Sequence, residues 1–182
     1  MFAVSDLHLF HANIIRGGKI AIRPFDTLEA MHERIIDGWN SVVKPNDKVY
    51  MLGDLTLWRA HKTRHAENAE MWAGLCSVVN RLRGKKRMLL GNHDHLPYWM
   101  YEALGFEKVL AYRVLAGMIL SHIPVHPSQF SRFKANVHGH THENSIKVVK
   151  DWEVVDRPQY VNVCVEALDY VPISLEEIQV NL

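Results

Sequence analysis

The feature that most constrains this chain is a repeated pattern in which a short apolar run ends in side chains that can bind a metal ion. Five runs end in this way, at Ser5-Asp6-Leu7-His8, Gly53-Asp54, Gly91-Asn92-His93-Asp94, Ser121-His122 and Gly139-His140-Thr141-His142. A short apolar run bounded by turn formers is typical of a buried strand. Strand ends at one edge of a sheet converge in space. The pattern therefore predicts a layered α/β domain whose strand ends share one site.

Apolar spacing predicts the elements between these strand ends. Apolar residues from Leu28 to Val42 recur every three to four positions, which predicts an amphipathic helix over 27–43. Asp26 and Glu29 have capping-box spacing, and Thr27 is a rival N-cap. The other expected elements are strands at 1–4, 48–52 and 87–90, a loop at 55–66, a helix marked by Met71 to Leu82 with Gly84 as C-terminal cap, a hairpin of 107–115 with 118–121, strands at 136–138, 145–149 and 160–165, and a short final helix opened by Ser174.

The composition is that of an ordinary globular protein, which we expect to form one domain over residues 1–182. Hydrophobic residues make up 48% of the chain, charged residues 23%, and the formal net charge is +1, so no bulk field marks a nucleic-acid or membrane binder. The two cysteines, Cys76 and Cys164, suit a reducing compartment. No apolar run reaches membrane-spanning length, and no signal-peptide pattern opens the chain. We expect a cytoplasmic protein that begins as written.

The residue types at the strand ends favour a catalytic metal site with two ions. Alternate residues on an extended segment point the same way, so Asp6 with His8, and His140 with His142, can each present two ligands to one centre. Carboxylate, imidazole and amide ligands without a thiolate suit Mn, Fe or Zn. Two ions about 3.5–4 Å apart clamp a phosphoryl group and hold a hydroxide between them. Asp54 is the natural bridge, because a carboxylate has two oxygens.

Five blocks of sequence carry a family resemblance. In order, "SDLH", "LGD", "GNHD", "SHIP" and "HGHTH" resemble the motifs of the calcineurin-like metallophosphoesterase superfamily, over residues 6–142. Further stretches, such as "HLFHANIIR", "RPF" and "YVNVCVE", are similar to small single-domain metallophosphoesterases of bacteria and their phages. The resemblance implies a four-layer α-β-β-α sandwich, with two mixed sheets flanked by helices.

The resemblance also implies two divalent metal ions, with Mn the expected ion in vitro and Fe, Zn or Ni as alternatives. It assigns Asp6, His8 and His142 to the first ion, Asn92, His122 and His140 to the second, and Asp54 as the bridge. His93 would protonate the leaving oxygen or stabilise the phosphoryl charge. Asp94 would orient the His93 imidazole, or is a residue of the turn.

Several residues have two interpretations that the sequence leaves open. His11 and Arg23 are candidate substrate-binding residues, but loop packing for His11 and a structural salt bridge for Arg23 are the alternatives. The basic run at 59–65 contacts a nucleotide backbone or is a solvated loop. The aromatic cluster at 98–101 stacks a base or packs a short helix. Cys164 is expected in an apolar strand of the core.

Two departures from the family pattern narrow the function. Gly53-Asp54 is not followed by the Asp-Arg-Gly block of the protein Ser/Thr phosphatases in this superfamily, and His8-Leu9-Phe10-His11 lacks the glycine usual in the closer subgroup. We expect a phosphodiesterase, in which a metal-bridging hydroxide attacks a nucleotide or small nucleic-acid derivative. A phosphomonoesterase or dinucleoside polyphosphate hydrolase is the alternative, and a scaffold with a vestigial site the remote one. We expect no membrane partner and no stable nucleic-acid complex.

Overall fold

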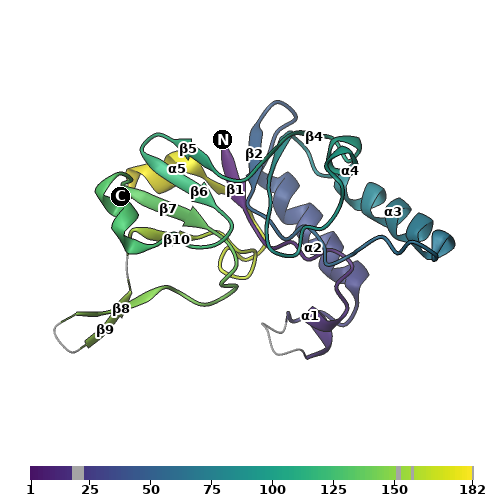
Figure 1. Ribbon diagram of the computed structural model, residues 1–182, viewed down its shortest axis with the longest axis horizontal. Coiled ribbons are helices and arrows are strands. Elements are labelled where there is room, and N and C mark those ends of the chain that lie inside the picture. Colours follow the sequence, from purple (N-terminus) through teal and green to yellow (C-terminus); the bar gives the residue numbers. More distant parts are fainter. Residues whose placement is uncertain (18–22, 151–152, 157, 182) are drawn as a thin grey trace.

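Two mixed β-sheets form the centre of the structure, a computed structural model that describes residues 1–17, 23–150, 153–156 and 158–181 (Figure 1). The first sheet has the order β11-β1-β2-β3-β4, and all its neighbours are parallel except β11 and β1. Its strands are β1 (Phe2–Val4), β2 (Lys48–Met51), β3 (Lys85–Leu89), β4 (Phe106–Leu110) and β11 (Ile173–Ser174). Parallel order places the ends of β1, β2 and β3 at one edge, where the polar blocks follow.

The second sheet has the order β10-β7-β6-β5, with β5 antiparallel to β6 and the other pairs parallel. Its strands are β5 (Arg113–Leu115), β6 (Met118–Ser121), β7 (Ala135–His138) and β10 (Tyr160–Asn162). A separate antiparallel pair is formed by β8 (Lys147–Lys150) and β9 (Glu153–Asp156). The ends of β6 and β7 therefore bring His122 and the block from Gly139 to the same place.

Helices cover the first sheet on the side away from the second sheet (Figure 1). Helix α2 buries Met31, Ile35 and Trp39, and the side chain of Thr27 caps it by accepting a hydrogen bond from the Ala30 N–H at 3.1 Å. Of the two expected caps, Thr27 is thus the one observed. The helices are α1 (Asn13–Arg16), α2 (Leu28–Val42), α3 (His65–Val79), α4 (Tyr98–Ala103) and α5 (Leu175–Val180), with a 3-10 helix η1 (Pro127–Ser131).

Two hydrophobic cores hold these layers together. One lies between the first sheet and helices α2, α3 and α4. The other lies between the two sheets, where Tyr50 and Leu89 from the first sheet meet Leu120 and Val137 from the second. Helix α5 contributes Leu175 and Ile178 to this second core. Two mixed sheets with helices confirm the expected fold class, and no helix in the described part of the chain could cross a membrane.

Several element boundaries differ from expectation, and the largest differences are around β4 and β5 and at the two ends of α3. The expected strand 107–115 is two strands in different sheets, because the chain leaves the first sheet after Leu110 and enters the second at Arg113. Helix α3 begins at His65, inside the expected loop. Its first turns contain Ala and Glu residues, which favour a helix although they form no apolar face. It ends at Val79 with Asn80 as its C-cap, while Gly84 adopts a φ of 93° in the turn before β3.

Candidate metal centre

The first polar block turns sharply where β1 ends. Asp6 and His8 have φ values of 60° and 48°, in the left-handed region that is uncommon for residues other than glycine. Their N–H groups donate to the carbonyls of Gly53 and Asp54, each at 3.0 Å. The two side chains do converge, as expected. The segment is not extended, however. The side chains converge because Asp6 and His8 both adopt the left-handed backbone conformation.

Positive φ is common among the expected ligands. Five of the seven expected ligands have it, and such residues cluster at functional sites, where the surrounding fold over-determines them. The five are Asp6, His8, Asp54, His140 and His142.

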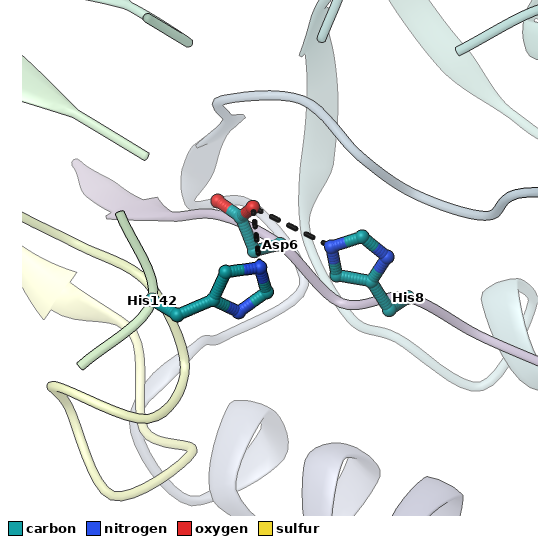
Figure 2. A group of neighbouring side chains, drawn as sticks. All are labelled: Asp6, His8 and His142. Carbon is teal, nitrogen blue, oxygen red and sulfur yellow. Dashed lines mark ion pairs between the residues drawn. The ribbon is translucent and has the colours of Figure 1, made fainter. Parts of the chain in front are cut away.

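Asp6, His8 and His142 form a buried triad (Figure 2). The Oδ1 atom of Asp6 lies 3.5 Å from Nε2 of His8 and 4.0 Å from Nε2 of His142. Exposed fractions are 0%, 1% and 7%, respectively. These three side chains are the ones that the sequence assigns to the first ion.

The triad fits a divalent ion. Oδ1 of Asp6 and both ring nitrogens of His8 are buried without a hydrogen-bond partner within the described structure, and an unsatisfied buried polar atom is unfavourable. Two ligands that each lie about 2.0–2.2 Å from one ion are separated by distances of the observed order. A cation bound between Asp6 Oδ1 and His8 Nε2 would satisfy these two facing atoms at once.

A second group extends from the triad through Asp54. Oδ2 of Asp54 lies 3.6 Å from Nε2 of His8 and 3.5 Å from Nε2 of His122. Asp6, Asp54 and His122 could themselves hold a metal ion. Nδ1 of His122 is 2.7 Å from the Leu52 carbonyl, so its N–H donates there and Nε2 is left to bind. Asp54 thus lies between the two groups, where a bridging carboxylate is needed.

The remaining two expected ligands lie on the exposed side of the cluster. Oδ1 of Asn92 is 2.8 Å from Nε2 of His122, and the ring of His140 is 5.1 Å from that of His122. The backbone N–H of His140 donates to Oδ2 of Asp6 at 2.9 Å. Both Asn92 and His140 are exposed, so the centre opens to solvent here.

Glycines at two block positions permit the close approach of these segments. A Cβ atom on Gly91 would lie 2.2 Å from Oδ1 of Asp54, and one on Gly139 would lie 2.4 Å from Oδ2 of Asp6. Any side chain at either position would push a carboxylate out of place. Both glycines are therefore required by the site itself.

His93 and Asp94 were expected to contact each other, but in the structure each contacts other groups. The His93 ring lies 5.8 Å from the His8 ring, and its backbone N–H donates to Oδ1 of Asp54 at 2.9 Å. The Asp94 carboxylate accepts hydrogen bonds from the N–H groups of Asp54, Leu55 and Gly91, at 2.7, 3.1 and 2.7 Å.

Asp94 therefore braces two turns, as the turn alternative proposed. No hydrogen bond joins it to the His93 imidazole in the part of the chain described, so the orienting role is not supported. Burial raises the pKa of Asp94 to about 6, although the backbone hydrogen bonds oppose this rise.

Arg23 lies beneath the site and contacts protein groups. It is 1% exposed, and its guanidinium donates to the carbonyls of Leu7 and Asp6 at 2.8 and 2.5 Å. It also pairs with Glu166, whose Oε1 is 2.8 Å from Nη2. These contacts match the salt-bridge alternative, and the expected phosphate contact is not supported by this position.

Glu166 is a functional residue that the sequence reasoning missed. Its Oε1 lies 2.9 Å from Nδ1 of His142, so it fixes the ring with Nε2 toward Asp6. Metal-bound histidines are commonly held by a carboxylate in this way. One signal was present, because Glu166 follows an apolar run just as the other blocks do.

The pKa values in the triad shift in different directions. Burial would raise the pKa of Asp6, but the His8 ring nitrogen 3.5 Å away and the charge of His122 hold it below its usual range. Burial lowers the pKa of His8, which keeps this imidazole neutral as a ligand must be. Burial also lowers the pKa of His142, but the hydrogen bond that this ring donates to Glu166, with the charges of Glu166 and Asp6, together raise the value.

The other open residues are placed as follows. The His11 ring lies 5.5 Å from that of His8, and burial lowers its pKa to about 4. It is thus beside the site, which leaves substrate contact a prediction. The Cys164 thiol is buried and donates to Oδ2 of Asp6 at 3.2 Å, but Cys164 follows β10 and lies outside any strand. In the 98–101 cluster, Tyr101 is buried and Trp99 is 62% exposed.

The basic run at 59–65 is exposed, as a solvated loop would be. Arg59 nonetheless contacts the ring of His95, just beyond the "GNHD" block. The contact of this run with a nucleotide stays a prediction.

Relatives of the chain come from an archaeon and a phage. The uncharacterised protein MJ1445 of Methanocaldococcus jannaschii is 30% identical over 179 residues, which cover 97% of this chain and 87% of that protein. The Gene 66 protein of Mycobacterium phage L5 is 28% identical over 172 residues, with 78% and 77% covered. No protein-family profile matches the chain.

A solved structure shares the fold. The protein of unknown function AQ665 from Aquifex aeolicus has a TM-score of 0.67 and 26% identity, and the match covers 100% of this chain and 98% of that one. Nuclease MPE of Pseudomonas putida has a TM-score of 0.48 and 21% identity, with 77% and 60% covered. That second likeness is too distant to bear on activity.

Proposed function

The chain belongs to the same protein family as MJ1445, and we propose that it is a metal-dependent phosphoesterase. One observation carries the proposal: Asp6, His8 and His142 turn three mutually close ligand atoms toward one point, and two of these atoms are buried without a hydrogen-bond partner in the described structure. The five ordered motif blocks add the finer assignment to the calcineurin-like superfamily.

Two divalent ions are part of the proposal. Asp6, His8 and His142 would hold the first, and Asn92, His122 and His140 the second, with Asp54 between them. Bound ions in such a site activate water and neutralise charge on a phosphoryl group. Mn is the ion with which we expect activity in vitro.

The chain's own residues position and protonate the substrate. His93 lies beside His8, and its backbone N–H donates to Oδ1 of Asp54. The proposed role of its imidazole is to donate a proton to the leaving oxygen. Asn92 supplies a neutral oxygen, which leaves the positive charge of the centre available to a phosphate. The exposed position of Asn92 and His140 gives the substrate its approach.

We propose a phosphodiester of a nucleotide or a small nucleic-acid derivative as the substrate. The absence of an Asp-Arg-Gly block after Asp54 supports a diester over a phosphoprotein. The comparison that tests this preference is kcat/KM for bis(p-nitrophenyl) phosphate against p-nitrophenyl phosphate, measured with one metal. A consistent monoester preference of tenfold or more, repeated with nucleotide substrates, would assign the alternative, a phosphomonoesterase.

Metal-stripped protein, reloaded with Mn, Ni, Mg or Zn, tests the activity itself. We expect elemental analysis to approach two ions per chain and hydrolysis of the model diester to return with Mn. A protein that binds metal but hydrolyses no phosphoester would leave only the scaffold role.

Asp54→Asn tests whether two ions share one carboxylate. We expect metal content to fall below two per chain and hydrolysis to fall by about 10³-fold, the upper end for loss of one electrostatic stabiliser. Asp37→Asn, on the exposed face of α2, is the matched control and should change neither quantity. Full metal content and full activity in Asp54→Asn would overturn the dinuclear assignment.

A further inference from the structure

A pocket of about 310 Å³ opens beside the exposed half of the metal centre. It lies where the chain passes from β4 in the first sheet to β5 in the second, and the end of β6 forms its other wall. Its lining residues are Leu90, Gly91, Asn92, Ala111, Ser121, His122 and Ile123. The pocket is thus built from both sheets at their shared edge.

The pocket is continuous with the ligand cluster. Asn92 and His122 line it, and they are also the two side chains joined at 2.8 Å on the exposed side of the centre. A phosphorus atom held at the centre therefore has one of its substituents at the mouth of this pocket. His93 is not among the described lining residues and lies beside His8, so we place the leaving group near His93 and the retained substituent toward the pocket.

The chemistry of the lining selects an uncharged organic group. Among its described lining residues there is no Lys, Arg, Asp or Glu, so the pocket offers no ion pair to a second phosphate. Leu90, Ala111 and Ile123 supply an apolar surface. Ile123 is 54% exposed, and Tyr112, which follows Ala111, is 59% exposed. Exposed aromatic and aliphatic side chains beside a small pocket are suited to stack or pack against a planar ring.

The walls are fixed before any ligand binds. The Ser121 hydroxyl donates to the Ile123 carbonyl at 2.8 Å, and the Leu90 N–H donates to the Leu110 carbonyl at 2.9 Å. The volume is at the lower end of roughly 300–1,000 Å³ for small-molecule sites. It therefore has room for one ring system.

Another pocket near the centre has the wrong charge for a phosphoester. It has about 520 Å³ and is lined by Phe10, Glu29, Glu67, Glu70, Met71 and Gly74. Three carboxylates there would repel an anionic ester. The uncharged pocket is thus the better match to the substrate.

We infer that the pocket between Ala111 and Ile123 binds the retained ester group of the substrate, and that this group is a planar uncharged ring such as a nucleobase. The inference rests on the proposed phosphodiesterase function and names its specificity site. The inference also predicts which substrates are preferred: a diester whose retained group is a nucleoside fits the pocket, whereas a retained group with a second phosphate does not.

Two diesters with the same leaving group test the inference: thymidine 5′-(p-nitrophenyl phosphate) and methyl p-nitrophenyl phosphate. We expect kcat/KM of the wild type to favour the thymidine ester by about tenfold, as one stacked base would give. Ala111→Trp fills the pocket from an exposed position and should remove that preference while leaving the methyl ester within about twofold. Ala69→Trp, on exposed α3 surface, should preserve the preference.

Ile123→Asp provides a second variant that does not depend on tolerance of a tryptophan. A carboxylate at the rim should weaken the thymidine ester selectively, and thermal unfolding of both variants checks their folding. Equal losses for both esters in both variants, or no loss in either, would overturn the inference.

A binding measurement separates this inference from failure of the proposed function. If the metal-loaded wild type hydrolyses neither ester, the phosphodiesterase proposal fails. Titration of ¹⁵N-labelled, Zn-loaded protein with thymidine 5′-phosphate then tests the pocket directly. Shifted amide signals of Ala111 and Ile123, lost in Ala111→Trp, would support it. Unchanged signals would overturn it.

Discussion

The two halves of the metal centre differ in how firmly the fold holds them. Asp6, His8 and His142 are at most 7% exposed, while Asn92 and His140 are open to solvent. Both halves combine two imidazoles with one side-chain oxygen, from Asp6 in one and Asn92 in the other, at similar strand ends. The difference therefore comes from what lies behind each of them.

The buried half has a supporting layer of its own. Glu166 holds the His142 ring, Arg23 holds Glu166, and the Cys164 thiol donates to Asp6. In the other half, the Leu52 carbonyl holds the buried His122 ring, and the exposed Asn92 and His140 side chains contact that ring. Under the proposed function, the buried half would be preorganised for its ion, while the exposed half would combine metal binding with substrate entry.

The largest expected effect concerns His93, which lies over the buried half and belongs to neither ligand set. His93→Ala should leave metal content near two per chain and slow hydrolysis of esters with poor leaving groups by about 10²–10⁴-fold, as loss of a general acid does. The loss should shrink for p-nitrophenyl esters, which need little protonation to leave.

His95→Ala is its control, because His95 is exposed two residues farther along the chain. Kinetics on alkyl and p-nitrophenyl diesters, with elemental analysis, give both readouts. Loss of metal from His93→Ala, with none from Asn92→Ala, would show that the two roles are reversed.

His8→Ala against Asn92→Ala compares the halves directly. We expect His8→Ala to weaken the first ion by more than the 10–100-fold typical of lost outer partners, with little recovery in excess Mn. Asn92→Ala should weaken only the second ion, and added Mn should restore part of the activity. Metal titration by calorimetry measures both affinities. Equal rescue of the two variants would remove the distinction drawn between the halves.

Glu166→Gln should weaken the buried half without removing a ligand. The amide keeps the shape but loses the charge that holds His142, so we expect metal affinity to fall by about 10–100-fold and activity to return at saturating Mn. Glu143→Gln removes an exposed carboxylate next to His142 in the chain and should have no such effect. An unchanged affinity in Glu166→Gln would mean that Arg23 and the backbone suffice.

The smallest effect concerns stability beneath the buried half. Nε2 of His32 accepts the Phe10 N–H at 3.1 Å, and burial lowers the pKa of His32. A lowered folded pKa means that this contribution is complete above about pH 6.5, the unfolded value, and is lost as pH falls from there toward the folded pKa.

His32→Gln should therefore cost about 1–3 kcal/mol of unfolding free energy at pH 7 and less at pH 5. Urea unfolding at both pH values measures this, with exposed His65→Gln as control. If the loss of unfolding free energy were the same at both pH values, protonation of His32 would not contribute to the acid sensitivity of the fold.

The ligand positions could be predicted because each motif block contains its ligands within a few consecutive residues. Each block follows an apolar strand, and parallel strands gather their ends, so Asp6, His8, Asp54, His122 and His142 meet as expected. The supporting layer could not be predicted in this way. Glu166 reaches His142 across 24 residues of sequence, and Asp94 uses its carboxylate on backbone N–H groups, which no residue pattern reveals.

The passage between the sheets was also hidden in the sequence. Ala111 and Tyr112 are not turn formers, so the run from 107 to 115 resembles one strand. Tertiary packing decides the break, since each part pairs with a different sheet. The pocket that this break creates was therefore invisible until the fold was known.

Positive φ at five ligand residues has a consequence for how mutations act on this protein. Each such residue costs of order 1–3 kcal/mol, and their sum is comparable with the 5–15 kcal/mol by which a typical domain is stable. The two cores must supply that difference and still hold the backbone in place. Core substitutions far from the centre should thus appear first as lost metal occupancy, at temperatures where the chain is still folded, which makes occupancy a more sensitive gauge of damage to this fold than its melting point.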